Sequence, residues 1–171
     1  MPEIDPGCVF CRIAQRKIES HVVYEDDLVF AFLDLGPIRP GHTQIIPKRH
    51  YDYFDDVPLH IAARIFEIGQ KLAKVMKGIY RIPRVALVFT GGDIAHAHAH
   101  VVALHEVTDI TSRRYIAEDQ LTFRPRPRAS PEELREEAQR LKAGLRLAAA
   151  EAESECGPGE TSSQKPGGPN P

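Results

Sequence analysis

Short apolar runs separated by turn residues occupy the first part of the chain. The runs Val22–Glu25, Leu28–Leu33 and His42–Ile46 are rich in β-branched and aromatic residues, and Asp-Asp and a Pro/Gly-rich turn separate them. This pattern predicts three antiparallel strands joined as a meander. The run "VALVFT" at 85–90 predicts a fourth strand, and "GGDI" is short enough to connect it as a hairpin to a fifth strand over residues 96–104.

Two later stretches repeat apolar residues at steps of three and four, which is the spacing of one helix face. Pro58 precedes the first stripe, and Gly78 lies near its end. Ser130 and Glu133 form a capping box ahead of the second stripe, which predicts a helix to about Glu153. The first stripe is Ile61, Ile65, Ile68, Leu72, Val75 and Ile79, and the second is Leu134, Ala138, Leu141, Leu145 and Ala148.

Together these elements predict an α+β fold: a five-stranded antiparallel meander sheet with one long helix between strands and a C-terminal helix. A length of 171 residues fits one globular core. We expect a domain at 1–153, with its core at 8–104 and a C-terminal extension at 105–153. Residues 154–171 contain Gly, Pro and Ser but little to bury, which predicts a disordered tail.

The composition is that of an ordinary soluble protein, with 42% hydrophobic residues, 27% charged residues and a formal net charge of -2. This charge gives no electrostatic reason to bind nucleic acid or a membrane surface. The N-terminal stretch "MPEIDPGCVFCR" lacks the regions of a signal peptide, and no apolar run approaches the roughly 20 residues of a membrane span. We expect a cytoplasmic protein that binds neither nucleic acid nor membrane.

Three histidines, His96, His98 and His100, alternate with alanines. In a strand all three rings would project from one face. An exposed polar face would explain one histidine, but three at a period of two favour a site, because histidine has no special preference for strands. Two chemistries remain open on spacing alone. The rings can bind a catalytic zinc with an open position, or the middle ring can act as a nucleophile between two supporting imidazoles.

The segment "HAHAHVV" resembles the H-x-H-x-H-x-x signature of the histidine triad (HIT) superfamily of nucleotide hydrolases and transferases. Three other segments, "CVFCRIAQRKIES", "VVYEDDLVFAFLDL" and "GHTQIIPKRH", are similar to segments of bacterial members in the same order. The resemblance covers about Cys8 to Leu104. It implies a homodimer that binds a nucleotide substrate, with adenine nucleotides as the expected class.

The resemblance also implies roles for particular residues. His98 would be the nucleophile that forms a nucleotidyl-histidine, and His100 would bind the phosphate oxygens and assist the leaving group. Asp34 would accept hydrogen bonds from the ribose hydroxyls, although an aspartate before a turn can also simply form the turn. The base would lie in an apolar slot whose residues can equally belong to the core, namely Phe10, Ile13 and Leu35.

The pair Cys8-x-x-Cys11 suits metal or redox chemistry in a reducing compartment, and no βαβ pattern supports the redox alternative. Bacterial relatives with such a pair carry a structural zinc. The resemblance therefore implies a structural Zn²⁺ bound by Cys8, Cys11, His50 and His96. Two reduced cysteines packed as small hydrophobic residues are the alternative.

The chain departs from the family on both sides of the histidines. Family members often carry Asn and Gln or Ser before the triad, where backbone N–H groups of Gly91 and Gly92 could here replace the donors and Asp93 would repel a polyphosphate. A basic cluster follows, which is either a solvated face or an arm that reaches the polyphosphate. Its members are Arg113, Arg114, Arg124, Arg126 and Arg128.

These observations favour a nucleotidyl hydrolase that cleaves dinucleoside polyphosphates, such as diadenosine tetraphosphate, or nucleoside phosphoramidates through His98. One alternative is a metal-dependent hydrolase with a catalytic three-histidine zinc site. The other is a non-catalytic nucleotide-binding protein.

Overall fold

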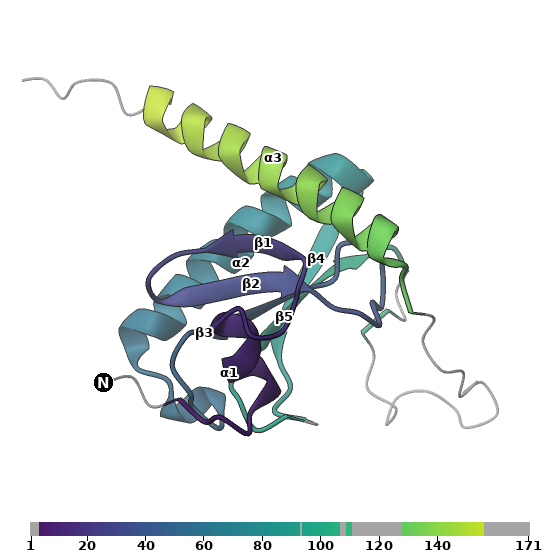
Figure 1. Ribbon diagram of the computed structural model, residues 1–171. Helices are drawn as coiled ribbons and strands as arrows, with labels where there is room; N and C mark the ends of the chain where they lie inside the picture. Colours follow the sequence, from purple (N-terminus) through teal and green to yellow (C-terminus); the bar gives the residue numbers. More distant parts are fainter. Residues whose placement is uncertain (1–3, 93, 107–108, 111–127, 156–171) are drawn as a thin grey trace, which may run out of the picture.

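The computed structural model describes residues 4–92, 94–106, 109–110 and 128–155. Within these residues one five-stranded antiparallel sheet is packed with a short helix and two long ones (Figure 1). The predicted α+β class and both long helices are confirmed. The elements are α1 (Val9–Ala14), β1 (Val22–Glu25), β2 (Val29–Leu33), β3 (Thr43–Pro47), the 3-10 helix η1 (Phe54–Asp56), α2 (Leu59–Tyr80), β4 (Arg84–Phe89), β5 (Ala99–Leu104) and α3 (Pro131–Glu155).

The sequence predicted the start of α3 correctly and its end to within two residues. The Ser130 N–H donates to Oε2 of Glu133 at 2.7 Å, and the Glu133 N–H donates to Oγ of Ser130 at 3.2 Å, so the predicted capping box is present. The helix continues through Glu155, two residues beyond the expected end. Of the predicted tail, residues 156–171 lie outside the described residues.

The strand order across the sheet is β1-β2-β3-β5-β4, with every neighbouring pair antiparallel. The first three strands form the predicted meander. The long helix α2 then carries the chain past one strand position to β4 at the edge, and β5 returns through the gap between β3 and β4. β3 and β4 consequently run parallel, as a helical crossover connection allows.

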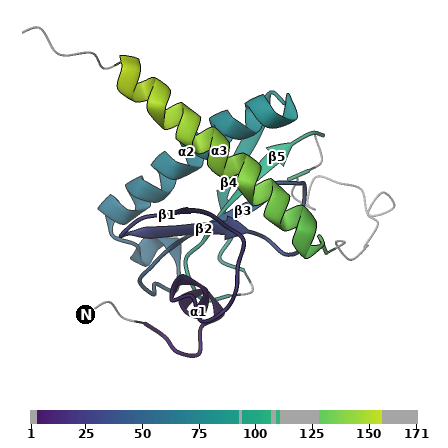
Figure 2. The same ribbon diagram turned by 45° about the horizontal axis from the view of Figure 1, so that its top comes forward.

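Helices cover both faces of the sheet (Figures 1 and 2). The side chains of successive β2 residues point to opposite faces of the sheet, and all five residues are buried. Val29, Ala31 and Leu33 join the core beneath α2 and α3. Phe30 and Phe32 pack with α1 on the opposite face, where the histidines also lie. None of the described helices combines the length and apolar character needed to cross a membrane.

The helices α2 and α3 approach closely where Gly144 faces Val75. A Cβ atom at Gly144 would overlap Cγ1 of Val75, a branched side chain with little rotational freedom. We expect Gly144→Leu to lower the free energy of unfolding by about 1–3 kcal/mol in urea denaturation. The control is Gly78→Ala on α2, where a Cβ would meet nothing within 4 Å and should stabilise the helix by about 0.5–1 kcal/mol. Equal stability of the two variants would contradict this packing.

Asp26 ties the β1–β2 turn to α2. Its carboxylate accepts hydrogen bonds from the backbone N–H groups of Leu28 and Val29, both at 2.8 Å, and from Nε of Arg64 at 2.6 Å. Burial by itself raises the pKa of Asp26, but these hydrogen bonds outweigh it and hold the pKa below its ordinary value. The ionised form of Asp26 therefore stabilises the fold.

Because the pKa of Asp26 is depressed, its contribution is present above the unfolded pKa of about 3.9 and is lost as the pH falls through the folded pKa. We expect Asp26→Asn to lower the free energy of unfolding by about 1–3 kcal/mol at pH 7. The difference in free energy of unfolding between this variant and the unmodified protein should disappear when denaturation is measured below about pH 4. Asp27→Asn, at the exposed neighbouring position, is the control. A gap that is unchanged at low pH would refute the role of the charge.

Candidate functional site

The three histidines do not share one strand, so this prediction is wrong. β5 begins at Ala99 and contains only His100, whereas His98 precedes it and His96 lies in a bend. Sulfur and carbonyl partners hold the His96 ring in a buried position of its own. The rings of His98 and His100 do stay together, with centroids 4.9 Å apart. The predicted hairpin connection is therefore longer than "GGDI" and contains two of the histidines.

Cys8, Cys11, His50 and His96 come together beside α1, and their ligand atoms all lie within 4.8 Å of one another. Sγ of Cys8 lies 3.4 Å from Nδ1 of His96. Sγ of Cys11 lies 3.3 Å from Nδ1 of His50 and 3.6 Å from Nδ1 of His96. Tetrahedral zinc, with Zn–S bonds of about 2.3 Å and Zn–N bonds of about 2.0 Å, would separate sulfur and nitrogen by about 3.5 Å. The distances therefore fit a four-coordinate metal.

The second nitrogen of each of these histidines is held by an oxygen. Nε2 of His96 lies 3.0 Å from the Pro47 carbonyl oxygen, and Nε2 of His50 lies 2.9 Å from Oδ1 of Asp52. A carbonyl only accepts, so Nε2 of His96 carries the hydrogen and Nδ1 presents its lone pair to the sulfurs. Burial lowers the pKa of His96 to about 4, which keeps the ring neutral. Both features are typical of metal-binding histidines.

Both cysteines of this group are free thiols and are buried. Burial raises the pKa of Cys11 to about 11. A metal bound there would displace the thiol proton, because a coordinating thiol is deprotonated. The four residues can therefore hold a metal whose binding releases protons.

His98 is positioned by the bend that precedes it. Its Nδ1 lies 2.6 Å from the carbonyl oxygen of His96, so Nδ1 carries the hydrogen and Nε2 has the lone pair in the neutral ring. The side chain is 6% exposed and borders a cavity of about 260 Å³. His98 belongs to neither group of potential metal ligands found in the described residues. The other residues lining the cavity are Tyr53, Phe54, Asp55, Phe89, Thr90, Gly91 and Ala97.

A chain of hydrogen bonds orients His100. The Ile38 N–H donates to Nδ1 of His42 at 3.3 Å, so Nε2 of a neutral His42 carries the hydrogen that is donated to Nδ1 of His100, 2.9 Å away. Nε2 of His100 then carries its own hydrogen and lies 3.3 Å from Oγ1 of Thr90. His100 is therefore arranged as a donor on the side of the His98 cavity.

Asp34 lies beside His42. Its Oδ1 accepts a hydrogen bond from the Gly36 N–H at 2.8 Å, and its Oδ2 accepts one from Nε2 of Gln44 at 2.7 Å. Oδ2 also lies 3.7 Å from Nδ1 of His42. Asp34 thus forms a turn and also joins the polar network that leads to His100. Asp34, His42 and His100 are the second described group whose geometry could hold a metal.

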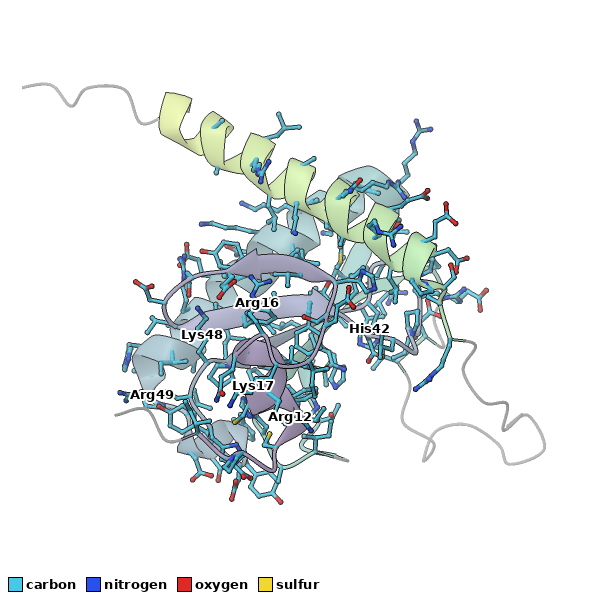
Figure 3. All side chains as sticks on the ribbon, viewed as in Figure 1. Arg12, Arg16, Lys17, His42, Lys48 and Arg49 are labelled. Carbon is cyan, nitrogen blue, oxygen red and sulfur yellow. The ribbon has the colours of Figure 1, made fainter. Side chains whose placement is uncertain are left out.

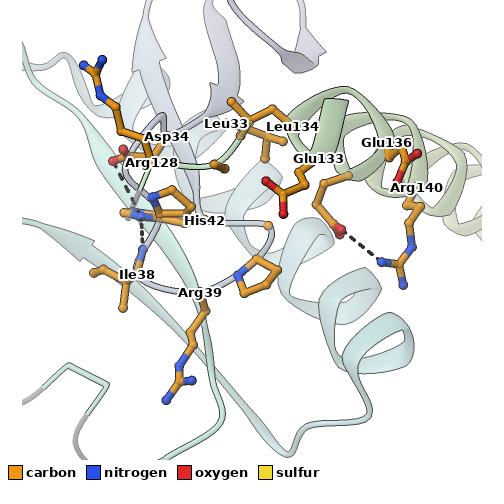
Figure 4. A pocket seen from close by; sticks show the side chains of 15 residues that line it. Leu33, Asp34, Ile38, Arg39, His42, Arg128, Glu133, Leu134, Glu136 and Arg140 are labelled. Carbon is orange, nitrogen blue, oxygen red and sulfur yellow. Dashed lines mark hydrogen bonds and ion pairs between the residues drawn. The ribbon is translucent and has the colours of Figure 1, made fainter. Parts of the chain in front are cut away.

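A cavity of about 540 Å³ lies against Asp34 and His42, with the first turns of α3 as one wall (Figure 4). Arg128 also lines it. The remaining members of the predicted basic cluster, Arg113, Arg114, Arg124 and Arg126, lie outside the described residues. The C-terminal extension therefore contributes part of the surroundings of Asp34.

The three residues expected to form the base slot differ in burial and do not line one common slot. Phe10 and Ile13 are buried in the α1 cluster, and the Phe10 ring meets the His98 ring edge-on at 5.2 Å. Leu35 is 54% exposed. Phe10 therefore borders the histidines, while Ile13 packs as core and Leu35 lies at the surface.

The two glycines before the histidines differ in position as well. Gly91 has a positive φ of 56° and lines the His98 cavity, close to Tyr53. Gly92 is not among the residues that line this cavity. Asp93 lies outside the described residues.

Basic side chains gather on the side of the molecule that carries α1 (Figure 3). Glu25 forms ion pairs with Arg16 and with Lys48. The labelled basic residues there are Arg12, Arg16, Lys17, Lys48 and Arg49.

Sequence reasoning missed His42, Gln44 and Thr90 as site residues. Gln44 pairs with His100 across β3 and β5, which places His42 on the same face two positions earlier. The polar spacing of His42 and Gln44 was a signal, but only the strand pairing shows which residues they face. The short helix α1 was also missed, because six residues give too little periodicity.

This chain is similar to known proteins in both sequence and structure. A HIT domain family model matches residues 15–107, more than half of the chain. An uncharacterized HIT-like protein of Methanocaldococcus jannaschii is 35% identical over 103 residues, which is 58% of this chain and 80% of that protein. Adenosine 5'-monophosphoramidase of Saccharomyces cerevisiae is 32% identical over 100 residues, covering 58% of this chain and 63% of that protein.

Among solved structures, a zinc-bound histidine triad family protein from Mycobacterium smegmatis has a similar fold. Its TM-score is 0.67 at 26% identity, with 85% of this chain and 97% of that chain covered. The match of the family model, on a shared fold and around the same histidine segment, means that this chain belongs to the HIT family.

Proposed function

We propose that this protein hydrolyses a nucleotide at its α-phosphate through a covalent nucleotidyl-histidine on His98. The observation that carries the proposal is the placement of His98. Its Nδ1 hydrogen is bound to the His96 carbonyl, and its ring borders a cavity, so Nε2 can act as the nucleophile.

In the first step Nε2 of His98 attacks the α-phosphorus, and the bond from phosphorus to the leaving group breaks. The leaving group departs with the bonding electrons and takes up a proton from water, while the Nε2–H of His100 can donate a hydrogen bond to it. The same N–H, together with the backbone N–H of Gly91, can donate to the phosphate oxygens as negative charge develops. The imidazole ring of the adduct is positively charged and still donates through Nδ1 to the His96 carbonyl.

In the second step water attacks phosphorus and the bond to His98 breaks. The imidazole is a good leaving group because it departs as a neutral ring. One water proton is lost to the solvent or to the nearby imidazole, and a nucleoside monophosphate is released.

Asp34, Leu35, Phe10 and Ile13 remain our candidates for the nucleoside end of the substrate. The contact between Phe10 and His98 supports an apolar wall next to the nucleophile. The yeast relative is named an adenosine 5'-monophosphoramidase. That name favours a nucleoside phosphoramidate, with an amine as leaving group, over diadenosine tetraphosphate as the first substrate to examine.

We further propose that the metal of the Cys₂His₂ group is a structural zinc. The donor set has no open position, which is typical of structural rather than catalytic zinc. The metal would fasten α1, through Cys8 and Cys11, to His50 and His96 on the sheet side. Two reduced thiols fit the reducing conditions of a cytoplasm.

A homodimer is supported by the edge strand β4. Its residues Val85–Phe89 are apolar yet only half-buried, and an unpaired apolar edge strand is a liability in a monomer. Phe54, whose ring centroid lies 6.0 Å from that of Phe89 on β4, is also a large exposed hydrophobic residue, 63% accessible. A second copy of the chain covering β4 would bury this surface.

The experiment offers a panel of adenosine phosphoramidates and dinucleoside polyphosphates and follows adenylate release. A protein quenched during turnover should carry one nucleotidyl group, located at His98 by peptide mass spectrometry. AMP binding without turnover of any substrate would instead support a non-catalytic nucleotide-binding protein. A catalytic three-histidine zinc is disfavoured, because the ligand atoms of His96, His98 and His100 do not form one group within the described residues.

A further inference from the structure

We infer that Gln44 is a substrate-reading residue, whose side-chain Oε1 accepts a hydrogen bond from a donor on the nucleoside. This inference rests on the proposed function and names a residue for which that function gives no role. It starts from one polar atom: within the described residues, Oε1 of Gln44 is buried and has no hydrogen-bond partner.

The position of Gln44 places it within the candidate site. It lies opposite Phe32 on β2 and opposite His100 on β5, so these three residues share one face of the sheet. Phe10 packs on Phe32 at 5.6 Å and on His98 at 5.2 Å. Gln44 therefore lies between His100 and Phe32, on which the proposed base-slot residue Phe10 packs.

The orientation of the Gln44 amide follows from charge. Nε2 donates to Oδ2 of Asp34 at 2.7 Å. The reversed amide would bring Oε1 against the carboxylate and set two acceptors together, which is unfavourable. Oε1 must then point away from Asp34, toward surroundings that supply no donor among the described residues.

A buried carbonyl oxygen without a donor is costly, and most such groups in proteins are satisfied. A donor on a group that enters the site can supply the missing hydrogen bond. The neighbouring carboxylate is also an acceptor, and a ligand with several donors therefore fits this corner. On AMP the available nucleoside donors are the 2'-hydroxyl, the 3'-hydroxyl and the 6-amino group.

The test measures binding of AMP and of three analogues, each lacking one donor, by calorimetry. The analogues are 2'-deoxy-AMP, 3'-deoxy-AMP and purine riboside 5'-monophosphate. In the unmodified protein, one analogue should bind about tenfold more weakly than AMP because it leaves Oε1 unsatisfied. In Gln44→Leu, AMP and that same analogue should bind with nearly equal affinity. The removal of the ligand donor and the substitution of Gln44 are then coupled by about tenfold in the dissociation constant.

Several controls keep the result interpretable. Gln44→Met is a second variant in case the leucine distorts the strand, and the thermal midpoint reports folding of both. Gln139→Leu, at an exposed position on α3, should bind all four ligands like the unmodified protein. In an Asp34→Asn background the coupling should persist if Oε1 itself contacts the ligand. Its disappearance there would mean that Gln44 acts only by positioning Asp34, which overturns the inference.

The outcomes also separate this inference from the proposed function. If AMP binds and phosphoramidates are cleaved, but no analogue shows coupling with Gln44→Leu, the inference fails while the proposed function stands. If the unmodified protein neither binds AMP nor forms the His98 adduct, the proposed function fails and the inference with it.

Discussion

His98→Asn is expected to reduce turnover of a nucleoside phosphoramidate by at least about a thousandfold, because the variant has no nitrogen that can form the covalent intermediate. Asparagine can still occupy the buried position beside Phe10, and the groups proposed to bind the nucleoside are unchanged. The dissociation constant for AMP should therefore change by no more than about threefold. The loss of activity should therefore appear as a lower kcat and not as weaker binding.

The measurements are initial rates of adenylate release, calorimetry with AMP, and mass spectrometry of quenched reactions. His60→Asn, which changes an exposed histidine at the start of α2, should leave all three unchanged. Retention of full activity in His98→Asn, with an intact fold, would end the proposal of histidine attack.

Cys11→Ser is expected to abolish stoichiometric zinc binding and to lower the thermal midpoint by about 10 °C. Tight metal binding stabilises the folded state by about 4 kcal/mol or more, and each kcal/mol corresponds to about 2–4 °C in a domain of this size. The sulfur of Cys11 approaches both histidines of the group, so its loss removes a ligand that lies next to each of them. Amide exchange should rise mainly in α1, which the cysteines hold to the sheet.

Cys156→Ser is the matched control, since this cysteine is not one of the four proposed ligands. Metal content is measured by elemental analysis and stability by thermal denaturation. A chelator gives the complementary test of mechanism. Turnover should persist at temperatures where the metal-free fold survives, because His98 retains its nucleophilic nitrogen. Complete loss of turnover from a folded, metal-free protein would instead favour a catalytic metal.

Much of the fold could be read from periodicity. The predicted apolar stripes of α2 and α3 each face the core, and Ile65, Leu72 and Leu141 are fully buried as their spacing predicts. The first four strand runs were found within one residue of their observed ends, whereas the fifth strand begins at Ala99, three residues later than expected. These features are local, because side-chain direction alternates in a fixed way along a helix or a strand.

The site was predictable in parts. The ligand group Cys8, Cys11, His50 and His96 was expected from a family resemblance rather than from geometry, since 88 positions separate Cys8 from His96 along the chain. The contribution of His42 and Gln44 was not foreseen. Both depend on the pairing of β3 with β5, and that pairing is invisible in the sequence pattern of either strand.

The sequence by itself determined the two long helices, the approximate positions of the five strands and which of their faces are buried, and it singled out three closely spaced histidines as a candidate site. Only the tertiary structure decided where each of those histidines lies and which groups it contacts. His96 leaves the strand because buried sulfur and carbonyl partners satisfy its two nitrogens, while His98 and His100 remain at the cavity. Local preferences follow from each residue and its neighbours, whereas the partners of a polar side chain depend on strand order and helix packing, which join distant parts of the chain.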